Sequence, residues 1–210
     1  MKKYEKAILW IALTQGALFF VLYRAHPSPK MVLDQAPEPL KISSLKLIGD
    51  EKELSGNRHA LYTLVEFGDY QCPPCAQSSS QIKLLMSRYP EFLRFRFRHY
   101  PLEMHPYAMN CAIAAEKART FGRFWDVHDQ FYALKTNIAP DEVTKLLNRM
   151  HLNINHLSIQ QQKAAKRRVQ EDMKIADLID LNGTPTFLLC CPDGRVLKLS
   201  SLSQAEYFLK

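Results

Sequence analysis

The chain has 210 residues, of which 47% are hydrophobic and 23% are charged. This length suits one folded domain with accessory segments, and the composition excludes a collagen-like, low-complexity or wholly disordered protein. The formal net charge is +7, and residues 1–30 hold five lysines or arginines but one glutamate. Because a nucleic-acid-binding protein would spread its excess positive charge over a binding face, we expect no nucleic-acid partner.

Residues 1–23 have the pattern of a membrane anchor or a signal segment. Three lysines precede an apolar run from Ala7 to Tyr23, which is close to the shortest stretch that crosses a bilayer. Basic residues ahead of the run favour a cytoplasmic N-terminus, so the rest of the chain would lie outside the cytoplasm. The alternative is a cleaved signal peptide, but Tyr23 and Arg24 are poor residues for a cleavage site. We expect an uncleaved anchor helix.

Residues 24–43 form the next segment, and their composition is typical of a linker. Four prolines interrupt it, and a stretch so rich in proline does not continue a helix. We expect an extended spacer here, which holds a folded domain over residues 44–210 away from the membrane.

The domain over 44–210 shows a strand–helix–strand unit, a block of helices and a closing hairpin. Apolar patterns predict strands over 45–48, 60–67 and 93–99, with a helix over 72–88. Several helices are expected between 103 and 181, followed by a hairpin over 186–199 and a final helix over 203–209. This order indicates an α/β fold with a helical insertion, about 103–181, between a βαβ unit and a ββα unit.

Other side chains are first interpreted as structural. The arginines that alternate with apolar residues in the strand at 93–99 are expected to face solvent. Four aromatic residues have helical spacing and are assigned to the core: Phe121, Phe124, Trp125 and Phe131. Buried small apolar residues are expected at Cys111, Cys190 and Cys191, and the alternative for the adjacent pair is a disulfide or a second redox site.

Cys72 and Cys75 form a Cys-Pro-Pro-Cys sequence where a strand gives way to a helix. A thiol at a helix N-cap faces unpaired N–H groups and the positive end of the helix dipole, which lower its pKa. Cys72 is therefore predicted to be the attacking sulfur, and Cys75, one turn further in, the resolving sulfur. Pro73 and Pro74 stiffen the turn but remove two N–H donors, so we expect moderate activation of Cys72.

The alternative for this pair is half of a structural zinc site. Such a site requires a second pair of cysteine or histidine ligands at similar spacing. The chain has no second Cys-x-x-Cys sequence, and only His99 and His105 are conceivable partners. We therefore expect neither a metal nor a cofactor.

Glu66 and the Thr184–Pro185 segment are candidate parts of the same site. Glu66 lies inside a buried strand, where a charge is costly, and it is predicted to exchange a proton with Cys75. The alternative for Glu66 is a side chain that faces solvent at the end of the strand. Pro185 is expected to pack against the cysteine pair and to leave a backbone edge free for an extended peptide.

Four sequence segments, in this order, resemble the DsbA-like thiol–disulfide oxidoreductases: 65–75, 98–108, 122–129 and 182–187. The resemblance covers about residues 60–200 and implies a thioredoxin fold with a helical insertion. It also implies that Pro185 is cis, that Cys72 is the nucleophile and that Glu66 is the acidic residue under the active site. Pro74 departs from the pattern, because strongly oxidising members of the family carry histidine at this position.

The resemblance implies an activity and its partners. The protein would pass a disulfide to cysteine-containing exported proteins, and a quinone-linked membrane protein would reoxidise it. Its place would be the inner membrane of a bacterium, with the catalytic domain in the periplasm. Two alternatives remain: a reductase or isomerase that uses the same residues and a membrane reductant donor, and a non-catalytic or metal-delivery module on the same fold.

Overall fold

The computed structural model describes residues 37–134 and 138–209 of the chain. The anchor expected over residues 1–23 lies outside these residues, as does most of the linker over 24–43. Within the described residues, no helix combines the length and the apolar character needed to cross a bilayer.

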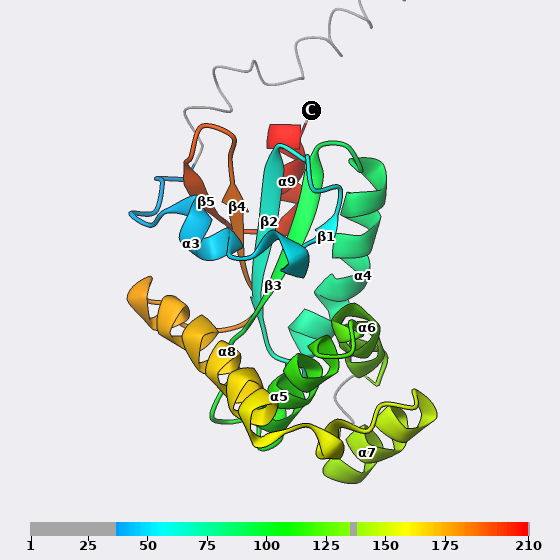
Figure 1. The fold of residues 1–210 in the computed structure, drawn as a ribbon. Helices are drawn as coiled ribbons and strands as arrows, with labels where there is room; N and C mark the ends of the chain where they lie inside the picture. The colour runs from blue at the N-terminus through cyan, green and yellow to red at the C-terminus, as the bar shows by residue number, and fades with distance from the viewer. Residues whose placement is uncertain (1–36, 135–137, 210) are drawn as a thin grey trace, which may run out of the picture. The chain divides into compact units, whose positions relative to one another are not determined.

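A five-stranded mixed sheet forms the centre of the fold (Figure 1), with the strand order β1–β3–β2–β4–β5. The middle strand β2 (Tyr62–Gly68) runs parallel to β3 (Leu93–His99) and antiparallel to β4 (Thr186–Cys190). The edges are β5 (Val196–Leu199) and the short β1 (Ser55–Gly56). The pattern of near-continuous apolar residues predicted β2 correctly, because this strand is buried on both faces.

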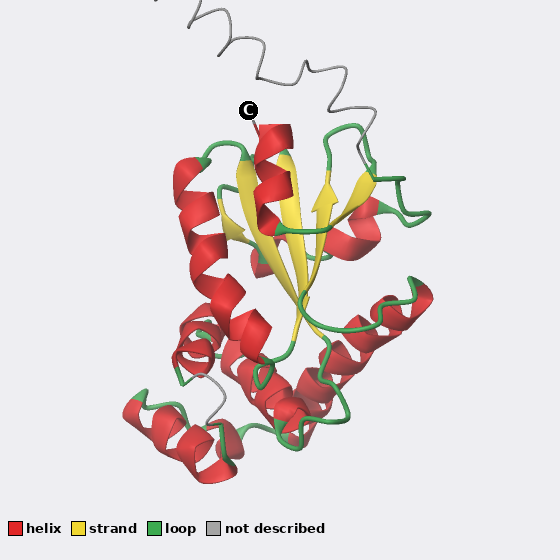
Figure 2. Cartoon of the chain, turned by 180° about the vertical axis from the view of Figure 1, so that it is seen from behind, coloured by secondary structure: helices red, strands yellow, loops and turns green. Residues whose placement is uncertain are grey.

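One face of the sheet is covered by α4 (Pro73–Arg88) and α9 (Leu202–Leu209), which lie in front of the strands in Figure 2. Leu64 and Phe95 belong to the same core cluster as Leu85 of α4 and Leu202 of α9. The helix α4 begins with two prolines, which fit the first helical positions because the N–H groups that they lack would have no intrahelical partner there. The fold thus places the Cys-x-x-Cys sequence at the start of a helix that packs on the central strand.

The helical insertion lies between β3 and β4, as the sequence predicted. It contains α5 (Ala108–Arg119), α6 (Phe124–Ala133) and α7 (Pro140–Arg149), with the 3-10 turn Ile154–His156 before α8. The long helix α8 (Ile159–Leu178) starts at a capping box formed by Ser158 and Gln161, and it leads the chain back toward β4.

The strand predicted at Leu45–Ile48 is wrong, because residues Ser44–Ile48 form the helix α3. Leu47 is fully buried while Leu45 is 78% exposed, so a single turn of helix buries one leucine. An apolar run this short is compatible with either periodicity, and the sequence gives no longer pattern to decide. Pro39, from the expected linker, forms an isolated bridge with Leu197 of the edge strand β5.

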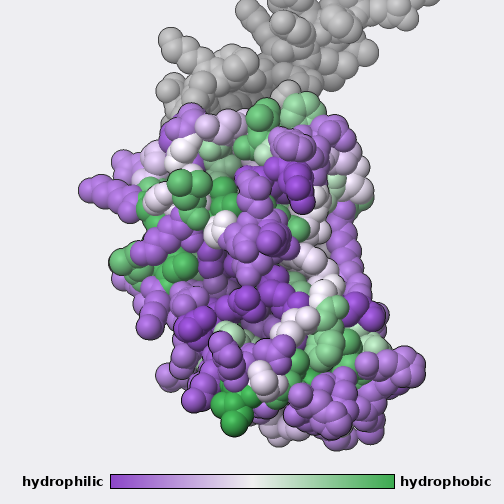
Figure 3. Space-filling view, viewed as in Figure 1, coloured by the Kyte–Doolittle hydropathy of each residue, from purple (hydrophilic) through white to green (hydrophobic). Residues whose placement is uncertain are grey.

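Two arginines of β3, Arg96 and Arg98, are buried, so the prediction that they face solvent is wrong. The reason is that acidic side chains from distant segments lie over this face of the sheet. Arg98 pairs with Asp172 of α8, whose second oxygen accepts the His99 backbone N–H at 2.9 Å, and Arg96 pairs with Glu53. Figure 3 shows that the outer surface on this side is largely hydrophilic, with apolar side chains in separate patches.

The aromatic core is predicted correctly except at one position. Phe124 and Phe131 are buried, and Trp125 packs against the same cluster, but Phe121 is 44% exposed. Phe121 lies between α5 and α6, where Gly122 adopts a φ of 70°. The helical spacing that assigned Phe121 to the core does not hold there, because the chain turns at this residue.

Candidate active site

The turn between β2 and α4 carries the cysteine pair, and the carboxylate of Asp69 holds it in place. One oxygen of this carboxylate accepts the Gln71 backbone N–H at 2.7 Å. The other accepts the Leu102 backbone N–H at 2.8 Å and lies 2.7 Å from Nδ1 of His105. The backbone carbonyl of Asp69 also accepts the Cys72 N–H at 3.1 Å. In sequence, only the Gly-Asp turn signal points to this anchoring role.

Cys72 is the N-cap of α4, and the pKa values of the two buried cysteines shift in opposite directions. Hydrogen bonding from the Cys75 thiol lowers the pKa of Cys72 to about 6; burial opposes the shift, and contact with the Thr184 side chain adds to it. Burial raises the pKa of Cys75 far above that of an ordinary thiol. Cys72 is therefore largely a thiolate at neutral pH, while Cys75 keeps its proton.

The segment before β4 lies against this turn. In its protonated form, the thiol of Cys72 donates to the Thr184 carbonyl at 3.2 Å, which joins parts of the chain 112 residues apart. The peptide bond between Thr184 and Pro185 is cis, as the family resemblance implied. Pro73 and Pro74 are exposed on the helix side of the pair, whereas Thr184 and Pro185 are half-buried.

Glu66 is completely buried in β2, so the alternative that it faces solvent is wrong. Burial raises the pKa of Glu66 to about 8, although a hydrogen bond from Ser78 at 3.4 Å opposes the shift. The second carboxyl oxygen, Oε2, has no hydrogen-bond partner among the described residues. Glu66 is therefore protonated at neutral pH, close enough to Cys75 for the two groups to influence each other's titration.

The remaining cysteines have no thiolate character near neutral pH. Burial raises the pKa to about 12 for Cys111 and Cys190 and to about 11 for Cys191. Cys190 packs in the core cluster on one face of the sheet and Cys191 in the cluster on the other face. Their side chains therefore point apart, and this arrangement does not favour a disulfide between the adjacent residues.

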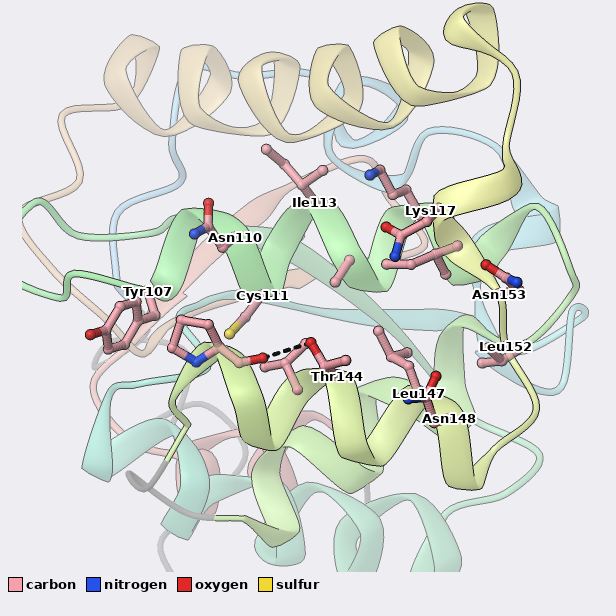
Figure 4. Close-up of a pocket in the computed structure, with 15 residues that line it drawn as sticks. Tyr107, Asn110, Cys111, Ile113, Lys117, Thr144, Leu147, Asn148, Leu152 and Asn153 are labelled. Carbon is pink, nitrogen blue, oxygen red and sulfur yellow. Dashed lines mark hydrogen bonds between the residues drawn. The ribbon is translucent and has the colours of Figure 1, made fainter.

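A hollow lies between α5 and α7 in the insertion, and Figure 4 shows Cys111 on its wall, between α5 and the start of α7. Gln71, which directly precedes Cys72, forms hydrogen bonds just before each of the two helices, α5 and α7, that enclose this hollow. Its side chain accepts the Tyr107 N–H at 2.6 Å and donates to the Ile138 carbonyl at 3.3 Å. This glutamine therefore ties the cysteine turn to the insertion, a role that the sequence pattern does not reveal.

The histidines considered as zinc ligands have acidic partners instead. Nε2 of His99 lies 3.0 Å from Glu116, and Nδ1 of His105 lies 2.7 Å from Asp69. Among residues 37–134 and 138–209, no three histidine, cysteine, aspartate or glutamate side chains are grouped as metal ligands would be. Nδ1 of the buried His128 lies 3.2 Å from the Tyr70 hydroxyl.

The fold and the site together define a class of protein. A central strand leads into a helix that begins with Cys-x-x-Cys, and a cis-proline loop packs against the first cysteine. Such a site belongs to thioredoxin-fold proteins that exchange thiols and disulfides. Residues 50–209 match the model of the family described as Thioredoxin, and the chain belongs to this family.

Solved structures share the fold. The thiol-disulfide exchange protein alpha-DsbA2 from Wolbachia pipientis has a TM-score of 0.67 and 15% identity, covering 79% of this chain and 89% of that one. A periplasmic thioredoxin-like protein from Salmonella enterica serovar Typhimurium has a TM-score of 0.65 and 18% identity, covering 81% of this chain and 97% of that one. At these identities, the similarity establishes the DsbA-like fold.

Curated relatives of higher identity are much longer proteins. The Na(+)/H(+) antiporter NhaA 3 of Salinispora tropica is 34% identical over 145 residues, which are 67% of this chain but 22% of the antiporter. The antiporter NhaA 1 of Salinispora arenicola is 35% identical over 144 residues, again 22% of its length. The chain therefore spans about a fifth of these relatives, and the similarity concerns that part of them.

Proposed function

We propose that the protein is a thiol–disulfide oxidoreductase that introduces disulfides into exported proteins through Cys72 and Cys75. The observation that supports this direction is the low pKa of Cys72, since a stabilised thiolate stabilises the reduced pair and makes its disulfide more oxidising. A pKa of about 6, in place of an ordinary value of about 8.5, stabilises the reduced form at pH 7 by at most about 1.4 kcal/mol. This free energy corresponds to about 30 mV.

The proposed reaction begins when a client thiolate attacks Sγ of Cys72 in the Cys72–Cys75 disulfide. A mixed disulfide forms, and Cys75 leaves as a thiolate that takes the proton of the Glu66 carboxyl. A second client thiolate then attacks the client sulfur, forms the client disulfide and releases Cys72 as a thiolate. Two electrons thus pass from the client to the cysteine pair, and Glu66 regains its proton from solvent.

We assign binding of the client to the groups around the Cys72 sulfur. Pro73 and Pro74 are exposed beside it, and the Thr184 carbonyl contacts it. An extended client segment would pair with the backbone around Thr184 and Pro185 as an added strand, so the client's cysteine would be carried to Cys72 by main-chain contacts. This mode accepts many sequences, which suits a broad set of cysteine-containing clients.

We place this domain outside the cytoplasm, held at a bacterial inner membrane by residues 1–23. Support comes from the lysines and apolar run of that segment, and from the fold shared with a protein described as periplasmic. After each cycle the reduced pair must lose two electrons. For a domain at this membrane, a quinone-linked membrane protein is the proposed acceptor.

The reduction potential of the Cys72–Cys75 pair tests this proposal. It would be measured in glutathione buffers on the full chain, with alanine replacing the three other cysteines. We expect a value between about −120 and −200 mV, the range of oxidants and isomerases. A value near −270 mV, as in thioredoxin, would contradict the oxidase and favour a reductase fed by a membrane reductant donor. Failure of the pair to form a disulfide would favour a non-catalytic or metal-delivery module.

A further inference from the structure

Tyr132 of α6 brings a buried hydroxyl to the side of β2 that carries Glu66. Glu66 and Gly68 lie two residues apart on this strand, so they face the same side of the sheet. A Cβ atom at Gly68 would lie 2.9 Å from the Tyr132 hydroxyl oxygen and 2.4 Å from the ring of Phe97. The missing side chain at Gly68 therefore makes room for the phenol next to Glu66.

The Tyr132 hydroxyl and the Oε2 atom of Glu66 are both buried, and neither has a hydrogen-bond partner among the described residues. Buried polar atoms without partners are rare in folded proteins, because each one loses its bonds to water on folding. The two groups are chemically complementary, since a phenol donates a hydrogen bond and a carboxylate accepts it. Leaving both atoms unpaired costs stability in the resting fold, and an interaction between them during the reaction would account for their placement.

We propose that Tyr132 is a positioning residue for the proton transfer at Cys75, with its hydroxyl donating to the Glu66 carboxylate, directly or through one bridging water. This inference rests on the role proposed for Glu66 and deepens it. A hydrogen bond to the ionised carboxyl favours that form. Glu66 can then give its proton to the leaving Cys75 near neutral pH and take it back when Cys75 attacks.

The other groups that face this space are already engaged. The Ser78 hydroxyl donates to the Cys75 carbonyl at 2.9 Å as well as to the other Glu66 oxygen, Oε1. The Tyr70 hydroxyl bonds His128, and burial lowers the pKa of His128 to about 3, so this histidine is neutral. The other titratable groups whose charges raise the pKa of Glu66 or of Tyr132 are Cys72, Cys75 and Asp69. The Thr184 hydroxyl is also buried without a partner, but it lies against Cys72. Within the described residues, Tyr132 is therefore the unengaged donor on the side of β2 that carries Glu66.

The substitution Tyr132→Phe tests the inference in the full chain. Two quantities would be followed: the titration of the Glu66 carboxyl by infrared difference spectroscopy, and the pH profile of the step in which Cys75 resolves a mixed disulfide. We expect both midpoints to rise by about one pH unit, because the ionised carboxyl loses a hydrogen bond. Near pH 6, where Glu66 is protonated, the melting temperature should not fall, because there is no ionised carboxyl for the hydroxyl to bind.

Tyr70→Phe is the matched control, because it removes another phenol hydroxyl from the same aromatic cluster but breaks the bond to His128. It should lower the melting temperature and leave the titration of Glu66 in place. Equal shifts in both variants, or no shift in Tyr132→Phe, would overturn the role of Tyr132. If Tyr132→Phe causes no shift but Glu66→Gln still changes the pH profile, the proposed role of Glu66 stands and that of Tyr132 does not. A profile that responds to neither variant overturns both roles.

Discussion

Cys75→Ser should trap a stable disulfide between Cys72 and a client, whereas Cys72→Ser should trap none and should lower the exchange rate by about 1000-fold or more. The reason is the asymmetry of the pair. Cys72 is the N-cap with a pKa of about 6, while Cys75 is completely buried and retains its proton. A serine at position 75 cannot displace the client from the mixed disulfide, so the covalent intermediate persists.

The trapping experiment can be read from absorbance and from mass. A peptide whose single cysteine is activated as a disulfide with a coloured aromatic thiol reacts with reduced enzyme. Attack by Cys72 releases the coloured thiolate, and wild-type Cys75 then releases the peptide as a free thiol. Retention of the peptide by Cys72→Ser rather than by Cys75→Ser would reverse the two assignments.

Glu66→Gln should make the folded protein more stable and the exchange reaction slower. The folded-state pKa of Glu66, about 8, lies above its ordinary value of 4.5. The folded state therefore binds this proton more tightly than the unfolded state, so stability falls as pH rises from 4.5 to 8 and then levels off. The gain in the free energy of unfolding of Glu66→Gln over the wild type should therefore be larger at pH 9 than at pH 4 by about 4–5 kcal/mol.

The same substitution should slow the resolving step by about 100-fold at pH 7, since glutamine neither gives nor takes a proton.

Glu116→Gln is the control for stability, because Glu116 is also buried but has two hydrogen-bond partners. Burial would raise the pKa of Glu116, but hydrogen bonds from Arg119 and His99 hold it well below its usual value. Glu116→Gln should therefore destabilise the protein at neutral pH. Urea unfolding from pH 4 to 9 would compare both variants with the wild type. A Glu66→Gln variant that is less stable than the wild type at pH 9 would contradict the raised pKa of Glu66.

The parts of the site that are close in sequence were predictable, because local chemistry determines them. The Cys-x-x-Cys turn, the proline-led helix and the buried acid in the preceding strand all lie within residues 66–88. Thr184 and Pro185 were candidates because a proline opens the predicted hairpin strand downstream of a Cys-x-x-Cys sequence, and the family resemblance added that Pro185 is cis. The structure brings the Thr184 carbonyl to the Cys72 sulfur. The catalytic and binding roles of these residues remain predictions.

Features that depend on distant partners were not predictable. Alternation in β3 separates two faces of a strand but does not say what covers each, and Asp172 lies 74 residues from Arg98. The same limit applies to Tyr132, since nothing in its helical spacing shows that Gly68 leaves space for its hydroxyl. The run at Leu45–Ile48 failed for another reason, because one turn of helix and a short strand look alike in four residues.

The most direct test of the assignment of Cys72 as the attacking thiolate is the pH dependence of its alkylation. Reduced full-length protein, with alanine at positions 111, 190 and 191, would be treated with iodoacetamide and its labelled cysteines identified by mass spectrometry. We expect Cys72 to react with a midpoint near pH 6 and Cys75 to remain unlabelled until the protein unfolds. A midpoint near the ordinary value of about 8.5, or faster labelling of Cys75, would contradict this assignment.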